Sequence, residues 1–172
     1  MMNQNTRALA LTALYAAGAV VTLYLGTVIP TMGLTFAALA ALFTATSVIE
    51  GGLKYGVLCF GATALLGLLL IPVRSGPILY ATFFGAYPLV KSIAERRSSR
   101  ILGWGIKFGV FFGALIVYMT VLQELFLGEI VPADWAWPVI VLVVTAAFFV
   151  YDIGLSKLIG FYLARIYNRQ GR

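Results

Sequence analysis

Long apolar stretches alternate with short polar segments along almost the whole chain. The apolar stretches fall at residues 8–29, 34–50, 55–71, 77–94, 101–127 and 139–165. A helix that crosses the hydrocarbon core of a bilayer needs about 20 predominantly apolar residues, because each residue adds about 1.5 Å. The pattern therefore predicts an all-α polytopic membrane protein, a bundle of six transmembrane helices that forms one domain over residues 1–172.

The composition supports a membrane location. Hydrophobic residues make up 62% of the 172 residues, charged residues make up 10%, and the mean hydropathy is +0.99. Soluble domains have about 45–50% apolar and about 25% charged residues. The net charge of +6 does not indicate nucleic-acid binding, because the basic residues are concentrated at span ends and in one loop. We therefore expect contact with the lipid bilayer and no nucleic-acid partner.

A basic segment at residues 91–100 sets the predicted topology, since short cationic loops between spans stay on the cytoplasmic side. With this segment inside, both termini are cytoplasmic, and Arg74 is the only basic residue placed outside. The chain is thus predicted to be a multi-pass protein of the cell membrane. The basic residues placed inside are Arg7, Lys54, Lys91, Arg96, Arg97, Arg100, Arg165, Arg169 and Arg172.

The turns and the fourth span carry further local predictions. Gly51 and Gly52 indicate a sharp reversal between the second and third spans. The fourth span is short before Lys91, so we expect its helix to continue to residue 94, with the Lys91 side chain reaching toward the inner surface. Pro88 predicts a kink in this span.

Three segments carry a resemblance to a known family: ALALTALYAA at 8–17, IPTMGLTFAAL at 29–39 and KYGV at 54–57. Together they are similar to the start of the substrate-binding S components of energy-coupling factor (ECF) transporters. The resemblance covers the first three spans, and the remainder agrees in span number alone. It implies a prokaryotic plasma membrane, a vitamin-like small-molecule ligand, and two kinds of partner: a transmembrane coupling protein and separate ATPase subunits.

Ala13 and Ala17 lie one helical turn apart in the first span, with other alanines beside them. Small residues four positions apart let two membrane helices approach closely, because the hydrophobic effect does not drive helix association in lipid. One interpretation is packing within the bundle, and the other is docking onto another membrane protein. The resemblance implies docking, since the two alanines match the small-x-x-x-small motif that the family uses against its coupling partner.

Lys107 and Asp152 are ionisable residues inside predicted spans, where charges are costly. Consecutive antiparallel spans are usually neighbours, and the two residues fall at similar depth. We therefore expect a buried ion pair that fixes the helix register, because an unpaired charge there would be much more costly. A role in proton-coupled transport is the alternative.

We also expect a ligand pocket that opens outward. Glu124 lies at the outer end of the fifth span, where it either belongs to this pocket or is an ordinary residue of the membrane interface. The resemblance implies the same half of the molecule, because S components bind their ligands in an outward-facing cavity walled mostly by the later helices. The predicted ligand-binding residues are Arg74, Tyr80, Thr82, Tyr118, Gln123, Glu124 and Trp135.

Signals for catalysis are lacking. The chain has no histidine and one cysteine, Cys59, so we expect no metal site, no disulfide within the chain and no cofactor. It has no His-Glu-x-x-His, Gly-x-Ser-x-Gly or Walker motif, and we expect no enzyme activity. We expect the substrate-capture subunit of an ECF-type nutrient transporter. The alternatives are an accessory or structural membrane protein, such as an immunity or assembly factor acting through helix–helix contacts, and a small stand-alone carrier.

Overall fold

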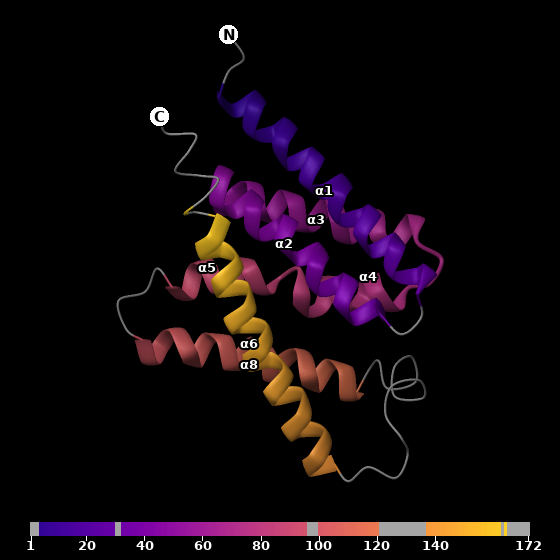
Figure 1. Cartoon of the computed structure of the whole chain (residues 1–172), viewed down its shortest axis with the longest axis vertical. Helices are drawn as coiled ribbons and strands as arrows, with labels where there is room; N and C mark the ends of the chain where they lie inside the picture. Colours follow the sequence, from indigo (N-terminus) through magenta and orange to yellow (C-terminus); the bar gives the residue numbers. More distant parts are fainter. Residues whose placement is uncertain (1–3, 30–31, 96–99, 121–136, 163, 165–172) are drawn as a thin grey trace. The chain divides into compact units, whose positions relative to one another are not determined.

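A computed structural model describes residues 4–29, 32–95, 100–120, 137–162 and 164 (Figure 1). Contacts divide the chain into two compact units, Met1–Leu122 and Gln123–Arg172. The single domain expected from the sequence stays a prediction. The described elements are helices joined by turns, which confirms the all-α class.

The first unit begins with three long helices, α1 (Gln4–Val28), α2 (Gly33–Gly51) and α3 (Leu53–Leu70), which pack against one another (Figure 1). Their bounds lie close to the first three apolar stretches of the sequence. Gly52 alone separates α2 from α3, and its φ of +85° lies in the left-handed region that glycine adopts without steric cost. The predicted sharp reversal at the paired glycines is confirmed.

Small residues form the seam between α1, α2 and α3. Gly18 of α1 faces the ring of Phe43, and a Cβ added to this glycine would lie 2.7 Å from a ring carbon. Such residues allow the close backbone approach on which helix packing in lipid depends. The buried positions are Thr12, Ala16, Ala19, Leu23 and Gly26 on α1, Ala37, Ala40, Ala41, Thr44, Ala45 and Ser47 on α2, and Gly56, Cys59, Thr63 and Gly67 on α3.

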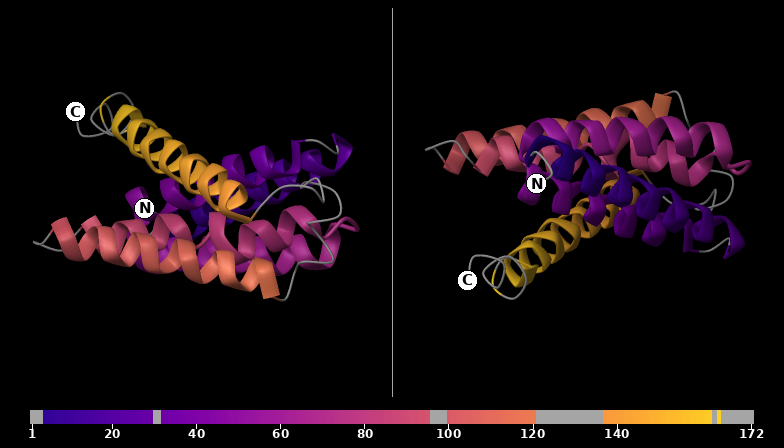
Figure 2. Two further views of the ribbon diagram at one scale, coloured as in Figure 1. Left: turned by 90° about the horizontal axis from the view of Figure 1, so that it is seen from below. Right: turned by 90° about the horizontal axis from the view of Figure 1, so that it is seen from above.

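The fourth apolar stretch forms three short pieces instead of one helix (Figure 2). They are α4 (Ser75–Leu79), the π-helix η2 (Tyr80–Phe84) and α5 (Tyr87–Glu95). The Gly85 amide donates to the Tyr80 carbonyl at 2.7 Å, which closes the wide turn. The backbone break therefore precedes Pro88, which lies in the first turn of α5, where a missing N–H is tolerated.

Helix α6 (Arg100–Thr120) packs against α5 and η2 in the first unit, and α8 (Trp137–Tyr162) is the helix described in the second unit. Four described helices are long and apolar enough to cross a membrane: Asn5–Val28, Gly33–Gly51, Leu53–Leu70 and Val144–Tyr162. A shorter apolar helix covers Gly103–Val117. The chain therefore has the helices of a multi-pass membrane protein.

Candidate functional site

Helix α1 presents two different faces. Thr12, Ala16 and Ala19 are buried in the seam, whereas Ala13 and Ala17 are exposed on the neighbouring face. Within the first unit, Ala13 and Ala17 therefore lie outside the seam of α1, α2 and α3. The two alanines face either lipid or another membrane helix, and docking stays a prediction.

Tyr80 and Thr82, two of the predicted ligand-binding residues, lie on the π-helix and make different contacts. The Tyr80 side chain is fully buried, its hydroxyl lies 2.5 Å from Thr44 Oγ1 of α2, and its ring lies 5.9 Å from that of Phe60 of α3. The Thr82 hydroxyl donates to the Ile78 carbonyl of its own helix at 2.7 Å. The ligand role of these two residues stays a prediction.

The other predicted ligand-binding residues are described only in part. Arg74 is exposed at the start of α4. Tyr118 lies in α6, although the description of that helix does not extend to its side chain. Gln123, Glu124 and Trp135 lie outside the described residues. The outward-facing pocket therefore stays a prediction.

A buried polar cluster lies between α2, α3 and the π-helix, and the sequence reasoning missed it. We call it the hydroxyl cluster and define it as Thr44, Cys59, Thr63 and Tyr80, all of which have 0% exposure. The Cys59 thiol lies among the hydroxyls of Thr44, Thr63 and Ser47. Its members come from three elements, so no spacing within one segment of the sequence could have revealed it.

A second cluster, of charged residues, joins α5 to α6. Glu95 Oε1 lies 3.1 Å from Lys91 Nζ and 3.3 Å from Lys107 Nζ. Lys91 is 2% exposed, and the expected reach of its side chain toward the inner surface stays a prediction. Lys107 Nζ also lies 5.2 Å from the centre of the Trp104 ring, within the range of a cation–π contact.

Glu95 is thus a partner of Lys107 that the sequence reasoning did not identify. The spacing of four between Lys91 and Glu95 indicates their own pair, since residues four apart on a helix are neighbours. It does not point to Lys107, which lies twelve residues after Glu95 along the chain. The predicted partner, Asp152, lies on α8 in the second unit, where its carbonyl accepts a hydrogen bond from the Ser156 hydroxyl at 2.7 Å. The predicted pair of Lys107 and Asp152 stays a prediction.

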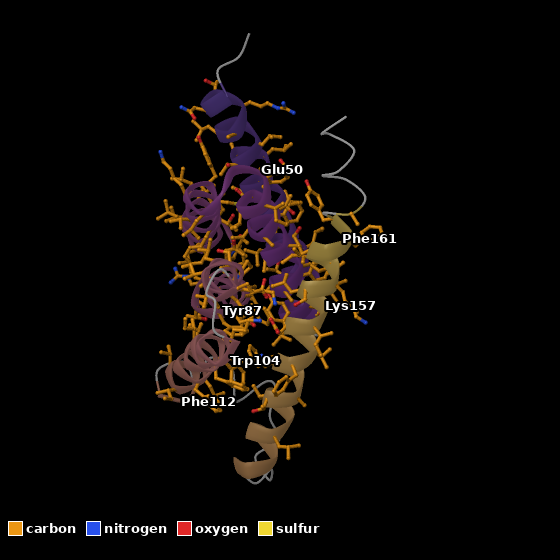
Figure 3. The ribbon with its side chains drawn as sticks, turned by 90° about the vertical axis from the view of Figure 1, so that its left-hand side faces the viewer. Glu50, Tyr87, Trp104, Phe112, Lys157 and Phe161 are labelled. Carbon is orange, nitrogen blue, oxygen red and sulfur yellow. The ribbon has the colours of Figure 1, made fainter. Side chains whose placement is uncertain are left out.

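One more polar contact ties α1 to α2. The Tyr15 hydroxyl donates to Glu50 Oε2 at 2.8 Å, and Glu50 is labelled in Figure 3. Tyr15 lies between Ala13 and Ala17 in the sequence, so this bond helps to fix the rotation of α1 and with it the direction in which the two alanines face.

Among the described residues, no group of three or more His, Cys, Asp or Glu side chains is placed to hold a metal ion. Comparison with known proteins gave no relative: no family model matches the chain, and no curated protein or solved structure matches it.

Proposed function

We propose that this chain is the substrate-capture subunit of an ECF-type uptake transporter for a vitamin-like small molecule, in the plasma membrane of a prokaryote. It crosses the membrane six times with both termini in the cytoplasm, and it has no enzyme activity of its own. The sequence has no nucleotide-binding motif. A transmembrane coupling protein and separate ATPase subunits would therefore supply the energy.

The exposed face of α1 is the observation that carries this proposal. Ala10, Ala13 and Ala17 are exposed, with Leu14 66% exposed beside them. Lipid accepts any apolar side chain, so it does not require alanines at helical spacing. A partner helix does, because small side chains allow its backbone to come close. The similarity of the first three spans to S components supports the same conclusion.

The six-span topology is tested by cysteine labelling in a background in which the buried Cys59 is replaced by alanine. A cysteine at Ser75, just before the fourth span, should react with an impermeant maleimide in intact cells. A cysteine at Ser99, in the basic segment, should react only after permeabilisation. Labelling of Ser99→Cys in intact cells would overturn the topology.

The function is tested by purifying the tagged chain from its native membranes and identifying by mass spectrometry what copurifies. We expect a membrane protein and ATPase subunits, together with ATP-dependent ligand uptake when that complex is placed in liposomes. Ligand flux by the chain alone in liposomes would instead show a stand-alone carrier. A stable complex that contains no ATPase would contradict the transporter and support an accessory role.

The accessory role has one observation in its favour, a second exposed strip on α6. Gly105, Gly109 and Gly113 follow one another at a spacing of four, and a Cβ added at any of them meets no atom within 4 Å. Trp104 and Phe112, labelled in Figure 3, are exposed beside them. An accessory protein that acts through helix–helix contacts would use such a strip, and the copurification experiment distinguishes the two functions.

A further inference from the structure

Thr63 of α3 differs from the other hydroxyl residues on the helices. Five of these residues donate their hydroxyl to the backbone carbonyl four residues earlier, at 2.7–2.9 Å. Thr63 Oγ1, which is fully buried, has no hydrogen-bond partner in the part of the chain that the structure describes. The residues that bond to their own helix are Thr12, Thr22, Thr46, Thr82 and Ser156.

The Thr63 hydroxyl faces other polar groups. It lies beside the Tyr80 hydroxyl and the Cys59 thiol, within the hydroxyl cluster defined above. Tyr80 is already engaged with Thr44 at 2.5 Å. The cluster contains hydroxyl and thiol groups alone, so all its members are neutral side chains.

The cluster lies at the break in the fourth span. The Tyr80 ring passes over Gly85, and a Cβ added to this glycine would lie 2.5 Å from the ring. This holds the Tyr80 hydroxyl against α2 and α3, next to the backbone where the π-helix ends. Broken helices within membranes keep their polar groups satisfied through neighbouring helices, Ser and Thr side chains, and ordered water.

We propose that the hydroxyl cluster is a binding site for one water molecule, held by Thr63 and shared with Tyr80 and Cys59. A buried hydroxyl without a partner is costly, and ordered water is the usual partner of buried polar groups that protein atoms leave unsatisfied. Water both donates and accepts, as a cluster of hydroxyls and a thiol requires. An ion is disfavoured, because none of the cluster's side chains carries a charge to neutralise it.

Hydroxyl-radical footprinting with X-rays tests this site, since radicals formed from a bound water oxidise the side chains next to it. In the purified protein we expect Tyr80 to be oxidised several-fold faster than Tyr87, which lies in the same span and also has 0% exposure. Thr63→Val should reduce the Tyr80 rate to that of Tyr87 and lower the melting temperature. Thr46→Val is the matched control, because its hydroxyl already bonds to the Leu42 carbonyl, and it should leave the Tyr80 rate unchanged.

Equal oxidation of Tyr80 and Tyr87 in the unmodified protein would overturn the water site, whether or not the variants fold. An increase in melting temperature with Thr63→Val would overturn it as well, because replacing a truly unpartnered hydroxyl by a methyl group removes a cost. These readouts do not depend on the proposed transport function.

Discussion

The first three helices and the fourth span solve the same problem, packing inside a membrane, in different ways. Helices α1, α2 and α3 are regular, and they meet through a seam of alanine, glycine and small polar residues. The fourth span is divided into α4, a π-helix and α5. Polar side chains of this span bond to other helices. The Tyr80 hydroxyl bonds to Thr44 of α2. Glu95 of α5 pairs with Lys91 of the same helix and with Lys107 of α6.

This difference indicates where the chemistry of the chain is concentrated. A regular helix satisfies its own backbone groups, and small side chains are enough to bring it close to another helix. A break in the membrane-spanning part persists only where neighbouring groups compensate for it. The fourth span has such neighbours, the hydroxyl cluster at its middle and the charged residues near its end, whereas α1 contributes an exposed face that includes Ala13 and Ala17.

The largest effect is expected from Gly85, where the break is packed most tightly. Gly85→Val should lower the free energy of unfolding by about 3 kcal/mol, because its Cβ would lie 2.5 Å from the Tyr80 ring and 2.9 Å from that of Phe60. Gly61→Val on α3 is the control, since a Cβ there meets no atom within 4 Å. Titration with sodium dodecyl sulfate measures both. Equal losses would mean that the break is not held by this packing.

A smaller effect is expected from the bond between Thr44 and Tyr80. Thr44→Val leaves the buried Tyr80 hydroxyl without this partner and should cost about 2 kcal/mol, as should Tyr80→Phe. The double variant removes both polar groups and should be more stable than the sum of the single losses predicts. Strict additivity in the same titration would show that the two hydroxyls do not interact.

The smallest effect is expected from Lys107 and Glu95. Glu95 has a side chain that is 54% exposed, so water screens its contact with Lys107. A double-mutant cycle with Lys107→Met and Glu95→Gln should give a coupling of about 0.5 kcal/mol, which decreases as salt is added. A coupling of zero at low salt would show that the carboxylate does not bridge α5 and α6.

The regular part of the fold could be predicted from the sequence because a membrane leaves few choices. An apolar stretch of sufficient length must form a helix that satisfies its own backbone, and the stretch at 34–50 became α2, Gly33–Gly51. The break in the fourth span was only partly foreseen. Pro88 marked an irregularity, but the close fit of Tyr80 over Gly85 at the end of the π-helix is visible only in the packing.

The candidate sites differ in the same way: pairs within one helix could be predicted from the sequence, and a cluster formed by several helices could not. The spacing of Ala13 and Ala17 is visible in one helix, and so is that of Lys91 and Glu95. The hydroxyl cluster brings Thr44, Cys59 and Tyr80 together from three elements. Its members look like ordinary residues of apolar spans until the packing is known.

The most direct test of the proposed docking face compares two neighbouring alanines of α1. Ala16 is 4% exposed in the seam, and Ala17 is exposed on the neighbouring face. Each is replaced by leucine, and the melting temperature and the recovery of copurifying partners are measured together. We predict that Ala16→Leu lowers the melting temperature because it overfills the seam, whereas Ala17→Leu keeps the melting temperature and loses the partners. Full partner recovery with Ala17→Leu, or an equal loss of stability in both variants, would contradict the docking face.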